Sequence, residues 1–418
     1  MNNDKSINMK TAVLLLRENP NQAPDPYRME ELKGLAAAAG YRVLAEITQR
    51  RGRDHRFQLG RGKIQEAMSY SPGTLIFYNP LSPGQVFNIR SEFSASTIDR
   101  FNLILEIFVS RASTREAKLQ IEMAKLTYDA PLVRNAISMK KKGEQPGFGG
   151  SGAYDESMYQ DIRSRIAKIK VALKDVESMG EDRRQHRREL GFDLVALAGY
   201  TNAGKSTLLN ALTNAGVDAK DQPFTTLSPT TRALDLSGRR VLLTDTVGFI
   251  DDLPHFLIKA FRSTLSEISE ADLVLLVADM SDTPEILRRK LAASHKALWD
   301  CGSQAPIITV LNKADRLAQG ESLERLAMVR DLAPNPVLLS ASTGLGFVDL
   351  MLLLHQKLQP LKEVQIKLPY TSEGMSELSR LYDRSEMLDV SYEDQMVVKL
   401  RGKEEVVTRA LSSSAREL

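Results

Sequence analysis

The sequence is poor in cysteine, in histidine and in long apolar runs, and each shortage excludes a class of protein. Its 418 residues include one cysteine, Cys301, so a disulfide framework is excluded and a reducing compartment is expected. With that cysteine and five scattered histidines, the sequence offers no structural zinc site. No window approaches 18 uncharged apolar residues, and the run at 11–16 is too short for a signal sequence. We therefore predict a cytoplasmic protein without a membrane span.

The net charge is small but unevenly distributed. The chain has 56 Lys and Arg against 53 Asp and Glu, a formal charge of +3. Residues 110–190 hold 17 basic and 12 acidic side chains, a charge of +5, which leaves −2 for the rest. Such a segment fits a polyanionic partner such as RNA, and it fits a solvated helical surface equally well.

The length and the pattern of apolar runs predict an α/β protein of several domains. Short apolar strands alternate with helical stretches in residues 9–109, which indicates a small parallel α/β domain. Five more such strands in residues 190–360 predict a doubly wound, mostly parallel sheet. The tail indicates a small α+β appendage. The predicted domains are 1–109, 110–189, 190–362 and 363–418.

Residues 110–189 predict a long antiparallel helical hairpin. Apolar residues recur at helical spacing in 115–128 and again in 161–179, as expected for the seam between two helices. The stretch 140–152 is basic and rich in glycine, and we expect it to form a mobile tip. Only this tip and the basic exit at 183–188 are candidates for contact with a partner.

Two further basic stretches, 51–53 and 59–63, contain glycine but lack the spacing of a phosphate-binding loop. Basic surface turns are the simpler interpretation.

The strongest motif is Gly199-Tyr-Thr-Asn-Ala-Gly-Lys-Ser206, which lies between the apolar run 194–198 and the helical stretch 207–212. A strand before and a helix after are the context that a phosphate-binding loop needs. Its glycines bring backbone N–H groups close to phosphate oxygens, and the helix N-terminus adds positive potential. Lys205 reaches the outer phosphates, and the Ser206 hydroxyl is placed to ligate Mg²⁺. The predicted contacts are Gly199, Tyr200, Thr201, Asn202, Ala203, Gly204, Lys205, Ser206 and Thr207.

Two motifs indicate which base is bound. In Asn312-Lys-Ala-Asp315, the Asp315 carboxylate can accept two N–H donors from guanine, a pair that adenine does not offer. The backbone of Ser340-Ala-Ser342 can meet the guanine oxygen. The predicted ligands are therefore GTP and GDP, with base contacts from Asn312, Lys313, Ala314, Asp315, Ser340, Ala341 and Ser342.

The stretches between these motifs predict the Mg²⁺ site. Asp245-Thr-Val-Gly248 follows the strand 241–244, where the carboxylate can hold Mg²⁺ and the Gly248 N–H can sense the terminal phosphate. The stretch 224–232 offers a threonine hydroxyl; Thr226 is our choice and Thr225 its rival. The predicted metal ligands are Ser206, Thr226 and Asp245. The predicted catalytic residues are Lys205, Thr226 and Gly248. Further nucleotide contacts are predicted at Phe224, Thr225, Thr246 and Val247.

Position 249 is phenylalanine, where many GTPases have a water-positioning glutamine. Because phenylalanine cannot orient water, we expect slow intrinsic hydrolysis that needs a partner, a cation or a rearrangement of 224–232. Asn202 is either a K⁺ ligand or a residue that only fixes the geometry of its loop.

These motifs resemble the HflX family of GTPases, within the Obg–HflX superfamily. Leu253-Pro-His255, Ala260-Phe-Arg-Ser-Thr-Leu265, Leu59-Gly-Arg-Gly-Lys63, Leu81-Ser-Pro83 and the stretch 111–120 carry the resemblance over about the whole chain. It departs at 149–154, Gly-Gly-Ser-Gly-Ala-Tyr, where bacterial members usually have Gly-Pro-Gly-Glu. The resemblance implies a GTPase that docks on the rRNA of the large ribosomal subunit, with splitting or rescue of ribosomes under stress.

Two alternatives stay open at this point. Some members of the family show ATPase activity linked to the amino-terminal domain, so an RNA-remodelling ATPase is one. The other is a signalling GTPase with a non-ribosomal partner, which the absence of a span or lipidation motif disfavours. We expect a monomer in either case.

Overall fold

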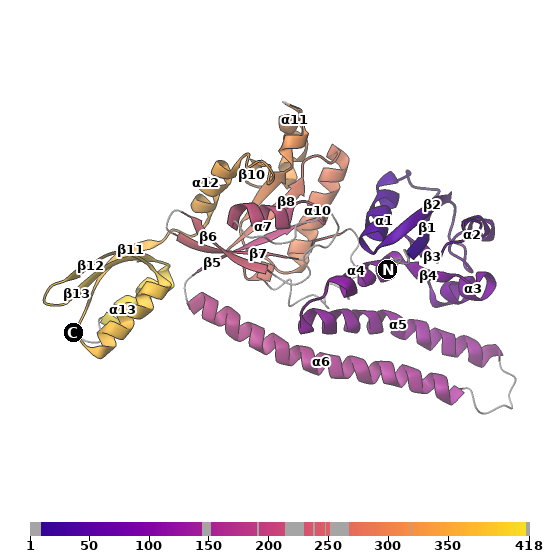
Figure 1. Ribbon diagram of the computed structural model, residues 1–418, viewed down its shortest axis with the longest axis horizontal. Coiled ribbons are helices and arrows are strands. Elements are labelled where there is room, and N and C mark those ends of the chain that lie inside the picture. The colour runs from indigo at the N-terminus through magenta and orange to yellow at the C-terminus, as the bar shows by residue number, and fades with distance from the viewer. Residues whose placement is uncertain are drawn as a thin grey trace, which may run out of the picture. The chain divides into compact units, whose positions relative to one another are not determined.

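The computed structural model describes residues 10–143, 152–189, 192–213, 230–236, 239–246, 248–250, 267–318 and 320–414 (Figure 1). These residues divide into two compact units, one up to Lys174 and one from Asp175 onward. The division falls inside a long helix. No helix of the described chain is both long and apolar enough to cross a membrane.

The first unit contains a parallel sheet of four strands in the order β2-β1-β3-β4. Its central strand β1 is buried on both faces, as Leu14, Leu15 and Leu16 are all nearly inaccessible, because helices cover both sides of the sheet. The elements in chain order are β1 (Lys10–Glu18), α1 (Pro26–Ala38), β2 (Tyr41–Arg50), α2 (Arg61–Met68), β3 (Thr74–Phe77), α3 (Pro83–Phe93), β4 (Ser96–Asp99) and α4 (Arg100–Arg111).

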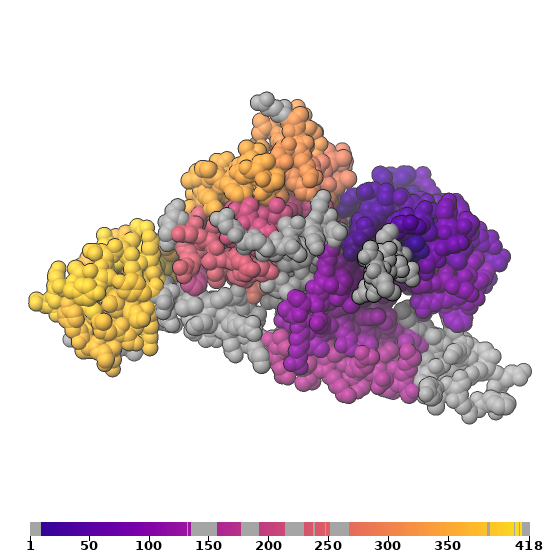
Figure 2. Space-filling model, viewed as in Figure 1, coloured from indigo at the N-terminus to yellow at the C-terminus, as the bar shows by residue number. Residues whose placement is uncertain are grey.

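The predicted hairpin is present as α5 (Arg115–Gly143) and α6 (Gly152–Glu189). The two helices run side by side (Figure 1, Figure 2). Leu126, Ile162, Ile169 and Leu173, which belong to the predicted apolar stripes, are buried between them. One expectation was wrong: residues 140–143 belong to the helix α5 and not to a loop. Residues 144–151 lie outside the described part of the chain.

The second unit is built on a six-stranded sheet in the order β10-β9-β8-β5-β7-β6. All neighbours are parallel except β6 and β7, so the sheet is mostly parallel, as predicted. Apolar clusters cover both of its faces. Its elements are β5 (Asp193–Gly199), α7 (Lys205–Thr213), β6 (Thr230–Leu236), β7 (Arg239–Asp245), β8 (Leu273–Asp279), α10 (Pro284–Asp300), β9 (Ile307–Asn312), α11 (Glu321–Val329), β10 (Pro336–Leu338) and α12 (Phe347–Lys357).

The antiparallel strand β6 was missed by the sequence analysis. It begins at Thr230, so the last three residues of the stretch 224–232 belong to a strand. Its alternation of exposed and buried residues is weak, and only Leu234 and Leu236 face the core, which explains the missed period.

The tail folds as a three-stranded antiparallel sheet with two helices, in agreement with the predicted α+β appendage. Its elements are β11 (Lys362–Leu368), α13 (Ser372–Arg384), β12 (Glu386–Tyr392), β13 (Met396–Gly402) and α14 (Glu404–Ser414). Lys403 connects it to the larger sheet, with its Nζ 3.0 Å from Asp193 and 3.2 Å from Asp272.

Candidate nucleotide-binding site

The loop between β5 and α7 needs both of its glycines. Gly199 has φ +141°, and a Cβ there would lie 2.1 Å from the carbonyl oxygen of Val277. Gly204 has φ +93°, and a Cβ there would lie 2.2 Å from Nδ2 of Asn312. Since side chains are excluded at both points by contact as well as by φ, the backbone of the loop packs directly against β8 and β9.

Lys205 opens α7 and folds back over the loop. Its Nζ donates to the carbonyl oxygens of Gly199 at 3.1 Å and of Tyr200 at 2.9 Å. Burial lowers the pKa of the Lys205 ammonium to about 8, against the opposing effect of Asp245. The site therefore keeps a buried ammonium that, among the described residues, hydrogen-bonds to backbone carbonyls and not to a carboxylate.

Ser206 and Asp245 meet behind this lysine. The Ser206 hydroxyl donates to Oδ2 of Asp245 at 2.6 Å, and both side chains are buried. Asp245 ends β7 in register with Leu197 of β5, so adjacent parallel strands bring the two motifs together. A hydroxyl and a carboxylate are the oxygen donors that Mg²⁺ prefers, with phosphate and water completing its shell. The two residues thus fit the predicted metal. Across the described residues, no cluster of three or more His, Cys, Asp or Glu competes with this site.

Gly248 and Phe249 complete the wall of the loop. A Cβ at Gly248 would lie 3.0 Å from Nζ of Lys205 and 2.9 Å from Cα of Thr201, so the two loops are in close contact. The Phe249 N–H donates to Gly199 at 3.0 Å, and its carbonyl accepts from Thr201 at 2.8 Å. The Phe249 ring is buried in the core. Its role in the fold is therefore to fasten the end of β7 to the phosphate loop.

Asn312 joins the two halves of the site. Its Nδ2 donates to the carbonyl of Ala203 at 2.9 Å, and its Oδ1 accepts from the backbone N–H of Ala341 at 2.9 Å. One buried amide thus ties the loop after β5 to the loop after β10. The motif in the sequence places Asn312 among the base contacts, and it does not predict this bridge.

Lys313 makes a second connection beside it. Its Nζ donates to the Asn202 carbonyl at 3.0 Å and lies 2.7 Å from the Asp279 carboxylate. Burial works to raise the pKa of Asp279, but the hydrogen bonds from Lys313 and Ser281 outweigh it and leave that pKa below its usual value. Asp279 is the last residue of β8, and no motif in the sequence predicts its place in the site.

The remaining predicted residues fall into three groups. Asp315 is exposed in the 3₁₀ turn Ala314–Arg316, while the Ser340 and Ser342 hydroxyls lie 3.0 Å apart in the neighbouring loop. Buried in the fold are Tyr200, Thr201 and Thr246, whose hydroxyl donates to the Leu197 carbonyl at 2.7 Å; Thr207 is half-buried in α7. Phe224, Thr225, Thr226 and Val247 lie outside the described residues.

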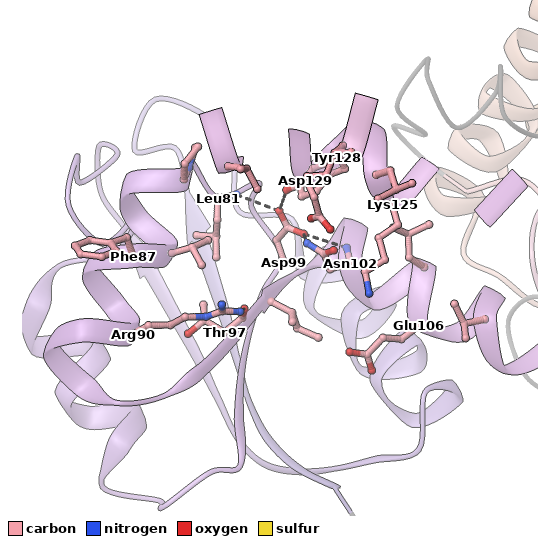
Figure 3. Close-up of a pocket in the computed structure, with 18 of the residues that line it drawn as sticks. Leu81, Phe87, Arg90, Thr97, Asp99, Asn102, Glu106, Lys125, Tyr128 and Asp129 are labelled. Atoms are coloured by element: carbon pink, nitrogen blue, oxygen red, sulfur yellow. Dashed lines mark hydrogen bonds between the residues drawn. The ribbon is translucent and has the colours of Figure 1, made fainter. Parts of the chain in front are cut away.

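The first unit carries a separate cleft of about 1130 Å³ beside β4, walled by α3, α4, α5 and α6 (Figure 3). Asp99 lies in it and accepts from the backbone N–H groups of Leu81 and Asn102 at 3.2 and 3.0 Å and from the Tyr128 hydroxyl. Burial raises the pKa of Tyr128, and Asp99 adds to the effect. The bond from Asn102 caps α4, and together the three bonds satisfy the buried carboxylate without a ligand. Neither basic stretch of the sequence, 51–53 or 59–63, lines this cleft.

Three family descriptions match successive parts of the chain. Residues 26–109 match "GTP-binding GTPase N-terminal", residues 111–187 match "GTP-binding GTPase Middle Region", and residues 194–313 match "50S ribosome-binding GTPase". GTPase HflX of Methanocaldococcus jannaschii is 39% identical over 412 residues, which cover 96% of this chain and 98% of the relative. The chain belongs to the HflX family of GTPases.

Other comparisons agree with this family. GTPase HflX of Thermococcus kodakarensis is 42% identical over 351 residues, 81% of this chain and 78% of that protein. The crystal structure of a GDP complex of the protein SsGBP is similar at a TM-score of 0.52 and 28% identity, covering 83% of this chain and 98% of that one. As an HflX family member, the chain binds guanine nucleotides and hydrolyses GTP. The predictions of the family, of the α/β fold and of a GTPase are confirmed.

Proposed function

We propose that this HflX-family protein is a Mg²⁺-dependent GTP switch that binds the rRNA of the large ribosomal subunit as a monomer. Residues 190–362 would be the switch, and residues 1–109 and 110–189 would make the ribosomal contact. The match of residues 194–313 to a family described as 50S ribosome-binding supports the partner. The charge of +5 on residues 110–190 suits an RNA partner. Such a partner implies a cytoplasmic, ribosome-associated protein.

Within the site, we assign the phosphates to the loop 199–207 with Lys205. The metal is assigned to Ser206, Asp245 and Thr226, and the terminal phosphate to the Gly248 N–H. Bound Mg²⁺ would neutralise charge on the phosphates. The base is assigned to Asp315 and to the backbone of 340–342.

The observation that carries the nucleotide assignment is the bridge made by Asn312. The phosphate-side loop and the base-side loop are bonded to one buried side chain at 2.9 Å each, so both ends of a nucleotide would meet a preformed surface. A preorganised site spends less binding energy on ordering its own loops.

Hydrolysis in this proposal is slow until the ribosome assists it. The side chain at position 249 lies in the core and carries no polar group that could orient water. A cation can help: the exposed Asn202 side chain, next to a carbonyl already bound by Lys313, offers an oxygen to K⁺. GTP turnover in potassium chloride should then exceed turnover in sodium chloride, and equal rates would remove K⁺ from the proposal.

The ribosomal assignment is tested by turnover and co-sedimentation. Large ribosomal subunits should raise GTP turnover at least tenfold, and the protein should sediment with them in a non-hydrolysable GTP analogue more than in GDP. Lys205→Ala is the control, since it should abolish nucleotide binding. Unchanged turnover together with nucleotide-independent sedimentation would refute the ribosomal part.

The base assignment has its own test. Asp315→Asn should make the protein prefer xanthosine triphosphate to GTP. The asparagine amide donates a hydrogen bond to the base at the point where the carboxylate accepts one. Retained selectivity for GTP in this variant would contradict the assignment.

A further inference from the structure

The segment from Arg50 to Lys63, which we call the arginine loop, is organised in a way that a surface turn does not require. It joins β2 to the first turn of α2 (Figure 1). It contains Arg50, Arg51, Arg53, Arg56, Arg61 and Lys63, and a single acidic residue, Asp54. The sequence analysis interpreted both of its basic stretches as turns.

Two buried glutamines hold this loop in one conformation. Gln58 and Gln85 are 2% and 0% exposed. The Gln85 Nε2 donates to the Asp54 carbonyl at 2.7 Å, and the Gln58 Nε2 donates to the Pro80 carbonyl at 3.2 Å. Asp54 and Gln58 also exchange a pair of backbone hydrogen bonds. Buried amides cost free energy unless they are bonded in this way, so the fold maintains a defined loop at its surface.

The acidic neighbours of the loop neutralise only some of its cations. Glu92 pairs with Arg56 at 3.4 Å and with Arg61 at 2.5 Å, and Glu66 pairs with Lys63 at 2.6 Å. The two carboxylates thus offset two of the three positive charges, since Arg56 and Arg61 share Glu92.

Arg51 and Arg53 are different, because within the described chain neither makes an ion pair. The Arg53 Nη2 donates to the neutral Oε1 of Gln85 at 3.2 Å. The Arg51 carbonyl oxygen accepts a hydrogen bond from the Arg17 guanidinium at 3.2 Å. The Arg51 guanidinium lies beside Gly60, with its Nη1 3.4 Å from the position that a Cβ on Gly60 would occupy. Both side chains are exposed. The loop thus holds two exposed guanidinium groups whose charge no described carboxylate offsets.

We propose that the arginine loop is an RNA-binding site in which Arg51 and Arg53 contact backbone phosphates. A guanidinium presents a planar fork of donors that matches two phosphate oxygens. The large apolar residues of the loop, Phe57 and Leu59, are 3% and 1% exposed, so nothing apolar is offered to a lipid bilayer. The contact would be independent of base sequence, since phosphates carry none. It rests on the proposed function only in identifying the RNA as ribosomal.

The test measures binding of the GTP-analogue complex to large ribosomal subunits and to a protein-free RNA hairpin at several salt concentrations. The variant is Arg51→Gln/Arg53→Gln. The matched control is Arg288→Gln/Arg380→Gln, which removes two exposed arginines that pair with Asp331 and Glu377. Thermal unfolding and basal GTP turnover should be unchanged in both, since neither pair touches the nucleotide site.

We expect the variant to bind RNA about 10- to 100-fold more weakly at 0.1 M salt, with the slope of log K against log salt reduced by about 1.4 to 1.8. The control should match the wild type. If the variant binds the subunits as tightly as the wild type does, the inference is overturned and the proposed function stands. If the wild type does not bind the subunits, the proposed function fails, and binding to the RNA hairpin then tests the site. Weaker binding of the variant to this RNA supports the site, and equal binding refutes it. A loss seen equally on phosphatidylserine vesicles would replace RNA by a membrane and overturn the inference.

Discussion

At the scale of single residues, burial and hydrogen-bond partners decide what the side chains of the phosphate-binding loop can do. The motif marks Lys205 as a phosphate-binding lysine, and the fold adds that its ammonium is buried against two backbone carbonyls. Asn312 is a second example. Its motif predicts contact with the guanine base, while its two hydrogen bonds connect two loops of the protein. In both cases the residue type was predictable and its partners were not, because the partners come from strands distant in sequence.

The pKa of Lys205 predicts a proton linked to nucleotide binding. With a pKa of about 8 in the free protein, the amine is largely neutral above that pH, whereas phosphates favour its charged form. GDP binding should therefore take up about 0.1 proton at pH 7.0 and about 0.8 at pH 8.5, and affinity should fall as pH rises through 8. Calorimetry in buffers of different ionisation enthalpy measures the uptake. Because Asp245 raises this pKa, Asp245→Asn should move the uptake to lower pH; equal uptake at both pH values would contradict the linkage.

Asn312→Ala should weaken GDP binding about 30-fold or more, because it leaves the Ala203 carbonyl and the Ala341 N–H without their buried partner. Equilibrium binding of a fluorescent GDP analogue measures this. Asn335→Ala is the matched control, since the side-chain hydrogen bond that Asn335 makes within the described chain goes to the Ile307 carbonyl, at 2.8 Å, at the opposite end of β9. The control should lose some stability and keep its affinity; equal losses in both would remove the bridge from the argument.

At the scale of elements, apolar runs were sufficient to predict strands that are buried on both faces, and they were insufficient at a sheet edge. β1 and β3 could be predicted from their apolar runs, since a strand buried on both faces has little other choice. β6 pairs at the edge of its sheet with only two residues in the core, so pairing with β7 decides its structure. α2 begins inside a glycine-bearing basic stretch, where propensity argues against a helix and the packing of Ile64 and Ala67 favours one.

Pro131 predicts a weak point in α5. It lies in the helix interior, where it removes one backbone hydrogen bond and crowds the preceding turn. Pro131→Ala should stabilise the helix against local opening by up to about 3 kcal/mol, seen as slower amide exchange in residues 127–135 by mass spectrometry. Pro83→Ala is the control, because Pro83 stands in the first turn of α3, where proline is tolerated. Unchanged exchange in the first variant would show that the hairpin already absorbs the defect.

At the scale of the whole molecule, one side chain connects the tail to the six-stranded sheet within the second unit. The tail has its own apolar core, yet Lys403 inserts its ammonium beside Asp193 at the start of β5. Asp193 is buried and also pairs with Arg239, at 2.5 Å. The end of β5 opposite the phosphate loop is thus built from three charged groups of three distant segments.

Lys403→Met should destabilise the second unit by about 1 to 3 kcal/mol, because a buried carboxylate loses one of its two cations. Lys399→Met, which breaks an exposed pair with Glu363, should cost no more than about 0.5 kcal/mol. Chemical unfolding of the nucleotide-free protein compares them. Equal effects would mean that Lys403 is no more than a surface charge.

The sequence by itself determined the family, the class of fold and the residue types of the nucleotide site. It could do so because phosphate and guanine recognition depend on short motifs at the ends of apolar strands, and both signals are local. Only the tertiary structure decided that the Lys205 ammonium is buried, that Asn312 joins two loops, and that Gln58 and Gln85 fix the arginine loop. Each of these depends on burial and on hydrogen bonds between segments far apart in the chain, and no local pattern encodes which distant segment will come to lie beside a given residue.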